Sequence, residues 1–65
     1  MSYLKFEELK SFGICSYRII NKKGEFLGLI EPEPAWGEYA FKPQSNTLFS
    51  ISCLIEIVSK MKTLD

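Results

Sequence analysis

The chain has 65 residues, enough for one small domain that buries roughly 60% of its unfolded surface. Its apolar content of 46% excludes a disordered chain, and its apolar runs are far shorter than the ~20 residues that a bilayer-spanning helix needs. Eight basic and eight acidic side chains cancel, which removes the bulk attraction to phosphate that dominates non-specific nucleic-acid binding.

Two cysteines and no histidine cannot supply the four ligands of a structural zinc site, so no metal and no cofactor are expected. Cys15 and Cys53 are expected to be free thiols in a reducing cytoplasm, because no signal peptide precedes the apolar segments.

The first twelve residues carry apolar side chains at intervals of three, with charged residues between them. These side chains are Tyr3, Phe6, Leu9 and Phe12. The spacing fits either a short helix or an extended segment at a sheet edge, and Gly13 ends it.

Two runs rich in β-branched and aromatic residues, 14–20 and 25–31, flank the turn sequence N-K-K-G at 21–24, which predicts a β-hairpin. If Ile20 pairs with Glu25, then Ile19 lies opposite Phe26 and Tyr17 lies opposite Gly28. The other side of the hairpin then carries Ile20, Leu27 and Leu29.

The sequence P-E-P at 32–34 is expected to end the second strand, because proline cannot donate to a ladder. A third strand is predicted over 36–42. Its alternation directs Tyr39 and Phe41 toward a core, and it places Trp36 on the second side, beside Leu27 and Leu29.

Residues 50–64 predict an amphipathic helix that begins at Ser50 as N-cap, with Phe49 and Leu54 as a hydrophobic staple. The stripe expected to face the core is formed by Ile51, Leu54, Ile55, Val58 and Met61. Ile57 and Leu64 widen this apolar sector at its shoulder.

Together these elements predict a single α+β domain spanning 1–65, with an N-terminal segment (1–12), a three-stranded antiparallel meander (14–42) and one C-terminal helix (50–64) on one face. The second face of the sheet is expected to be covered by residues 3–12 or by another chain. Its apolar residues are Ile20, Leu27, Leu29 and Trp36.

Three segments, Y-R-I-I-N-K-K-G-E-F-L-G-L-I, W-G-E-Y-A-F-K-P and N-T-L-F-S-I-S-C-L-I-E-I, together resemble a family of very short proteins of prokaryotes, phages and other mobile elements. The resemblance covers roughly residues 17–64 and consists of core, turn and cap positions. It implies a β-β-β-α domain and no catalytic residues. Its association with mobile elements implies a protein that binds and blocks a host component, such as a defence nuclease.

The residues themselves favour binding over catalysis. Only Glu31, Glu33 and Glu38 form an acidic cluster, no histidine is present, and so small a fold offers little room for a concave active site. We therefore expect a non-enzymatic, cytoplasmic protein-binding module. The residues expected to contact the partner are Trp36, Glu31, Glu33, Glu38, Leu27 and Leu29.

Two other functions stay open. Nucleic acid binding would use Arg18, Lys22 and Lys23 with the sheet, and it would weaken steeply with salt. In the other function, the second face of the sheet forms the interface of a homodimer.

Overall fold

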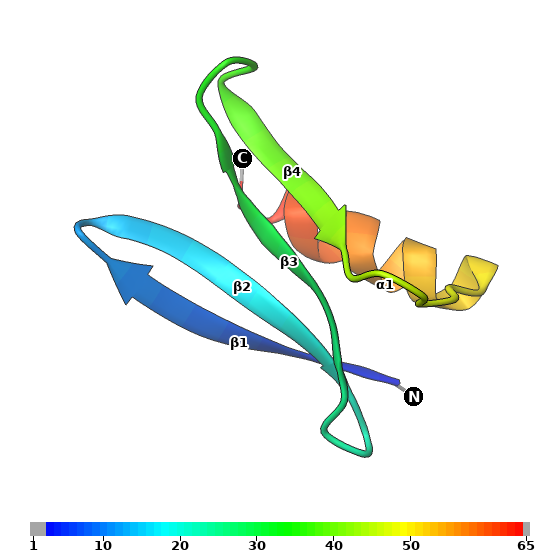
Figure 1. The fold of residues 1–65 in the computed structure, drawn as a ribbon. Coiled ribbons are helices and arrows are strands. Elements are labelled where there is room, and N and C mark those ends of the chain that lie inside the picture. Colours follow the sequence, from blue (N-terminus) through cyan, green and yellow to red (C-terminus); the bar gives the residue numbers. More distant parts are fainter. Residues whose placement is uncertain (1–2, 65) are drawn as a thin grey trace.

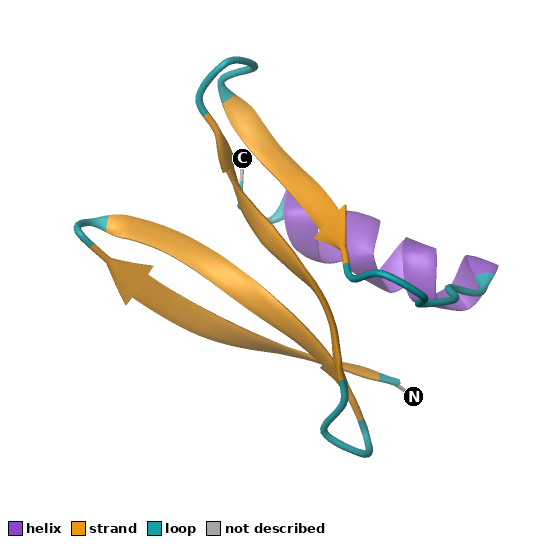
Figure 2. Ribbon diagram, in the orientation of Figure 1, coloured by secondary structure: helices purple, strands orange, loops and turns teal. Residues whose placement is uncertain are grey.

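The computed structural model describes residues 3–64 as an antiparallel sheet followed by a helix (Figure 1). The elements are β1 (Leu4–Ser11), β2 (Ile14–Asn21), β3 (Phe26–Glu33), β4 (Glu38–Pro43) and α1 (Ile51–Lys62). The strands neighbour one another in chain order, and α1 lies against one face of the sheet (Figure 2). The predicted α+β class and C-terminal helix are confirmed. The prediction of three strands is wrong, because the described residues form four.

The additional strand is β1, which pairs with β2 without interruption from Leu4↔Asn21 to Ser11↔Ile14. The turn between them consists of Phe12 and Gly13, whose φ angles of 51° and 78° are both positive, as a type I′ hairpin turn requires. Because β1 is extended, Leu4 and Phe6 lie on the same face of the sheet, two residues apart. The three-residue spacing of apolar side chains in the sequence therefore does not describe the conformation of this segment. The N-terminal segment therefore extends the sheet and does not cover its second face.

The predicted register of the β2–β3 hairpin is also wrong. Ile20 pairs with Phe26, but Ile19 pairs with Gly28, so the register shifts at this point and β3 holds an additional residue. The close approach of β4 explains the glycine, since a Cβ at residue 28 would lie 2.7 Å from the carbonyl oxygen of Lys42.

The core forms where the first three strands meet α1. The buried side chains are Leu4, Ile19, Ile30 and Ile57. Partly buried residues packed around them are Phe6, Tyr17, Leu27, Tyr39, Phe41, Phe49, Cys53, Met61 and Leu64. Tyr39 and Phe41 thus face the core as the alternation predicts, and the ring of Phe41 meets that of Phe49 edge to face at 5.3 Å.

Pro32 does not end β3, which continues to Glu33 and pairs there with β4. Pro32 does, however, lie just beyond the end of the pairing between β2 and β3, whose last paired residues are Tyr17 and Ile30. In the same register Cys15 would accept a backbone bond from residue 32, and proline has no N–H to donate. The Tyr39 hydroxyl donates to that Cys15 carbonyl instead, at 3.4 Å. The two hairpins therefore diverge at this end of the sheet (Figure 1).

Candidate protein-binding surface

The largest departure from the predicted arrangement is the orientation of α1. The Ser50 hydroxyl accepts from the Cys53 N–H, which confirms the predicted N-cap. The stripe expected to face the core, however, lies largely in solvent. Its exposed fractions are 77% for Ile51, 42% for Leu54, 59% for Ile55 and 49% for Val58. We call these four side chains the α1 flank.

A second stripe of α1 faces the sheet. Ile57 is buried, and Cys53, Met61 and Leu64 pack around the core with it. At about 100° per residue, the two stripes together span roughly 200° of the helix circumference. A flat sheet covers only one side of a helix, so half of this apolar arc stays exposed.

Polar contacts are also made on the side of α1 that lies opposite the α1 flank. Glu56 accepts from the Tyr3 N–H at 3.3 Å, and the Lys60 ammonium lies 4.6 Å from the centre of the Tyr17 ring. This side of α1 therefore adjoins β1 and β2, and the α1 flank faces away from both strands.

The α1 flank borders a shallow hollow of about 360 Å³. Ser59 and Lys62 complete its lining, so its one ionised side chain is a cation. Leu48, just before the helix, is almost fully exposed and adds to the apolar area at the N-terminal end of α1. The α1 flank is thus an exposed apolar surface with one cation at its edge.

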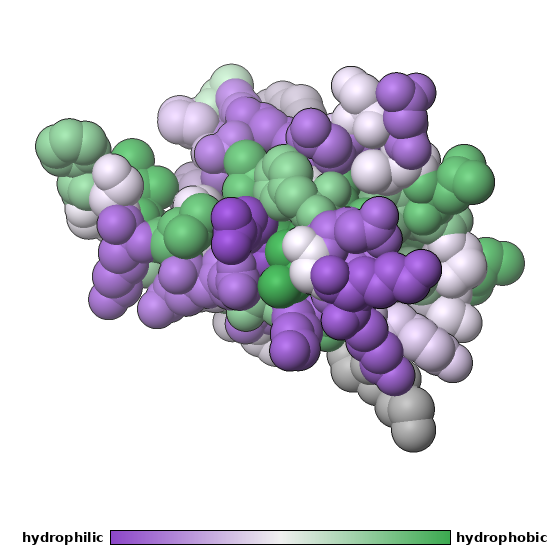
Figure 3. Space-filling model, turned by 60° about the horizontal axis from the view of Figure 1, so that its bottom comes forward, coloured by the Kyte–Doolittle hydropathy of each residue, from purple (hydrophilic) through white to green (hydrophobic). Residues whose placement is uncertain are grey.

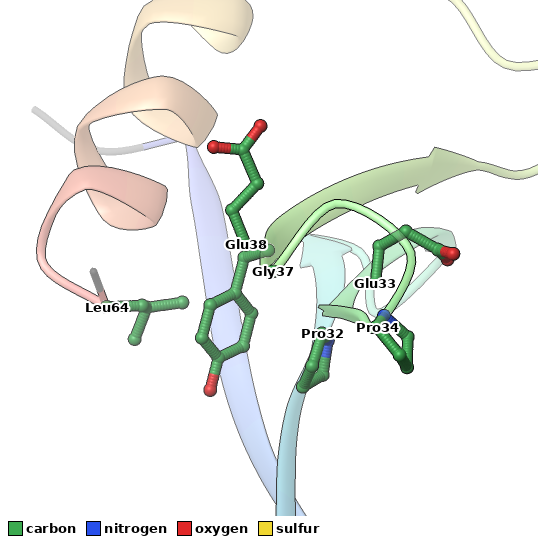
Figure 4. Close-up of a pocket in the computed structure, with 7 residues that line it drawn as sticks. Pro32, Glu33, Pro34, Gly37, Glu38 and Leu64 are labelled. Carbon is green, nitrogen blue, oxygen red and sulfur yellow. The ribbon is translucent and has the colours of Figure 1, made fainter.

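Part of the predicted partner site does come together, at the turn between β3 and β4. Trp36 lies within this turn and not in the strand, and it is 69% exposed. Glu33 and Glu38 pair across the base of the turn and border a hollow of about 290 Å³. Figure 4 shows their carboxylates pointing in different directions.

The other predicted contact residues lie elsewhere. Leu27 packs against the core, and Leu29 lies on the open face of the sheet, which is the face opposite α1. Glu31 is bonded to Lys42 on the same open face, with Nζ and Oε1 2.7 Å apart, and this bond raises the pKa of Lys42. Trp36 is therefore not beside Leu27 and Leu29, and the six residues do not form one patch.

The cations of the alternative nucleic-acid site also lie apart. Arg18 donates two bonds to Glu7 Oε1 in the middle of the sheet. Lys22 and Lys23 occupy the turn between β2 and β3, where the Lys22 ammonium lies 5.5 Å from the centre of the Tyr3 ring. These three side chains do not make a common basic surface.

Apolar surface is not confined to one side of the molecule. On the face shown in Figure 3, hydrophobic areas interrupt the hydrophilic surface and project at two opposite ends. Besides the α1 flank, the exposed side chains include Phe12, Ile14 and Trp36 in or beside the two turns at one end of the sheet.

No family model, curated protein or solved structure matches this chain. The resemblance to short mobile-element proteins therefore stays a prediction. Within residues 3–64, no helix is long and apolar enough to cross a bilayer. The same residues hold no group of three or more side chains arranged to bind a metal ion.

Proposed function

We propose that this protein is a non-enzymatic protein-binding module whose contact surface is the α1 flank. The observation that supports this function is the exposure of four large aliphatic side chains on one side of a single helix. Contiguous apolar surface of this kind on a small domain is typical of an interaction site.

The energetics favour a partner that reaches beyond the flank. Burying an aliphatic side chain contributes about 1.5–3 kcal/mol when it starts fully exposed, so four partly exposed ones contribute roughly 3–7 kcal/mol. Association itself costs an estimated 4–15 kcal/mol. Stable binding therefore needs further contacts, for which Leu48 and Lys62 lie at the two ends of the flank.

The partner that fits this surface best is an amphipathic helix of another protein. Two helices pack side by side through residues spaced three and four apart, which is the spacing within the α1 flank. Because Lys62 is the charged group of the lining, the partner helix carries an acidic residue at the matching end. An inhibitor of a host system would use such a surface to occupy its target.

The turn around Trp36 supplies a second contact surface for the same function. An exposed indole in the turn whose base carries Glu33 and Glu38 suits a basic protein surface, since one guanidinium can stack on the ring while other cations pair with the separate carboxylates. This second surface keeps Trp36, Glu33 and Glu38 from the partner site that the sequence predicts.

The test is site-specific photo-crosslinking in the native host. A photoreactive residue replaces Ile55 in one variant and Ser52, on the polar side of the same helix, in the control. We expect a defined adduct from position 55 only, and we expect Val58→Lys to abolish it. Adducts of equal yield at both positions, or none at position 55, would refute the α1 flank as the binding surface.

A further inference from the structure

The outer edge of β4 presents backbone groups directed away from the sheet (Figure 1). The Gln44 N–H donates to the Leu27 carbonyl at 2.8 Å, so the even-numbered residues of β4 direct their backbone groups toward β3. The N–H and C=O groups of Tyr39 and Phe41 therefore point outward. Because β4 is the last strand of the sheet, no strand within residues 3–64 pairs with these groups.

The sequence of β4 is complementary to itself. Glu38 and Lys42 lie on the open face of the sheet, two residues before and two residues after Ala40. The aromatic side chains of Tyr39 and Phe41 lie between them on the core face. An antiparallel copy of this strand, centred on Ala40, therefore brings acid opposite base and aromatic ring opposite aromatic ring.

We propose that a second copy of this chain pairs with the first through β4, antiparallel and centred on Ala40. In this register Glu38 lies opposite Lys42 of the second copy, and Lys42 lies opposite its Glu38. Tyr39 and Phe41 lie opposite each other in the same way. These two residues exchange backbone N–H···O=C bonds between the copies, since both direct their backbone groups outward.

Proline and charge select this register over its neighbours. Centring the pair on Phe41 would place Tyr39 opposite Pro43, which has no N–H to donate. Centring it on Tyr39 would place Glu38 opposite Ala40, so the opposite charges would no longer meet. Of the three registers, the one centred on Ala40 uses the outward N–H groups of both aromatic residues and joins both pairs of charges.

The proposed ion pairs are compatible with the contacts of the single chain. Glu38 pairs with Glu33 across the base of the β3–β4 turn, which brings two like charges to neighbouring positions. A cation from the second copy offsets this repulsion. Lys42 bonds to Glu31 through Nζ, and an ammonium has three donors, so it also reaches Glu38 of the second copy.

The consequence is a dimer with one continuous sheet. Directly opposite residues of two antiparallel strands lie on the same face, so both α1 helices lie on one face of the joined sheet. The residues that pair include none of the α1 flank, so the dimer goes beyond the proposed function. Each dimer then carries two copies of the proposed contact surface, related by a two-fold axis.

The test is sedimentation equilibrium of the full chain over a concentration series that extends to millimolar, where we expect a monomer–dimer equilibrium. Glu38→Lys and Lys42→Glu should each weaken dimerisation about tenfold, because both opposite-charge pairs become like-charge pairs. An equimolar mixture of these two variants should dimerise like the wild type, since opposite charges then meet again. Lys10→Glu changes the net charge as much as Lys42→Glu but lies on β1, so it should have little effect.

A disulfide locates the centre of the interface independently. In the proposed register the two residues 40 form a non-hydrogen-bonded pair, whose Cα atoms lie about 4.5 Å apart, within the range of a disulfide. We expect Ala40→Cys to give a disulfide-linked dimer on oxidation. Glu38→Cys, on the same face but opposite Lys42, should give none above the background of the wild type, which holds Cys15 and Cys53.

Three results would overturn the proposal. The first is a wild-type chain that is monomeric at every concentration. The second is a mixture of the two charge variants that dimerises no better than each variant alone, with circular dichroism verifying that both are folded. The third is equal disulfide formation from residues 38 and 40, since the register centred on Ala40 separates the two residues 38.

Discussion

At the scale of the residue, the least expected side chain is Phe12 in the β1–β2 turn. Its φ of 51° lies in the left-handed region, which costs a bulky L-residue roughly 1–2 kcal/mol, and its ring is fully exposed. Phe12 thus contributes neither packing nor a favourable backbone conformation to the folded domain.

We expect Phe12→Asn to raise the free energy of unfolding by about 0.5–1 kcal/mol, because asparagine adopts the left-handed conformation readily and Asn-Gly suits a type I′ turn. Chemical denaturation measures the change. Phe12→Ala is the matched control: it removes the ring but keeps the backbone cost, so stability should stay nearly constant. If alanine and asparagine destabilise alike, the ring makes a stabilising contact in the folded protein.

At the scale of the element, α1 holds two apolar stripes of similar spacing, and packing selects one of them. The selected stripe contains Ile57, which completes the core with Leu4, Ile19 and Ile30. Glu56 and Lys60 contribute to the choice, since their contacts with Tyr3 and Tyr17 require the polar side of the helix to adjoin β1 and β2.

The same substitution, isoleucine to valine, made on each of the two stripes of α1 checks this orientation. Ile57→Val removes a methylene from a fully buried site and should lower the free energy of unfolding by about 1 kcal/mol. Ile55→Val makes the same change on the α1 flank and should alter it by only a few tenths of a kcal/mol. Denaturant titrations of both variants give the comparison, and a larger loss at residue 55 would mean that the flank faces the sheet.

At the scale of the whole molecule, two side-chain contacts between neighbouring strands, Tyr17–Glu8 and Lys42–Glu31, depend on protonation. Partial burial and the nearby Glu8 carboxylate, which accepts from the Tyr17 hydroxyl at 3.3 Å, raise the pKa of Tyr17 above 10.0. The folded protein therefore holds the phenolic proton more tightly than the unfolded chain. The resulting stabilisation is complete below the unfolded pKa and is lost as pH rises from there through the raised pKa of the folded state.

We accordingly expect stability to decline above about pH 10, the ordinary pKa of tyrosine, and Tyr17→Phe to show a shallower decline. The Lys42–Glu31 bond acts in the same direction, because the raised pKa of Lys42 also marks a proton held more tightly in the folded state. Urea denaturation at a series of alkaline pH values measures both slopes. A variant that loses stability as steeply as the wild type would exclude Tyr17 as a source of the effect.

Local features of the sequence were sufficient to predict those elements that local interactions stabilise. The Asn21 side chain accepts from the backbone N–H groups of Lys23 and Glu25, which confirms the predicted turn, and Ser50 caps α1 as expected. The two aromatic residues of β4 face the core as their alternation indicates. For the turn and the helix cap, the deciding interactions lie within a few residues of one another along the chain.

The tertiary structure alone decided the register of β3, the place of Trp36 outside the sheet and the stripe of α1 that turns inward. Leu27 packs against the core because one additional residue shifts the pairing, which no pattern of apolar residues reveals. Both stripes of α1 satisfy the same helical period, so only the sheet opposite them distinguishes core from surface. The sequence by itself thus identified the middle hairpin, β4 and α1, whereas the strand conformation of β1 and the burial of each segment depended on what that segment meets in space.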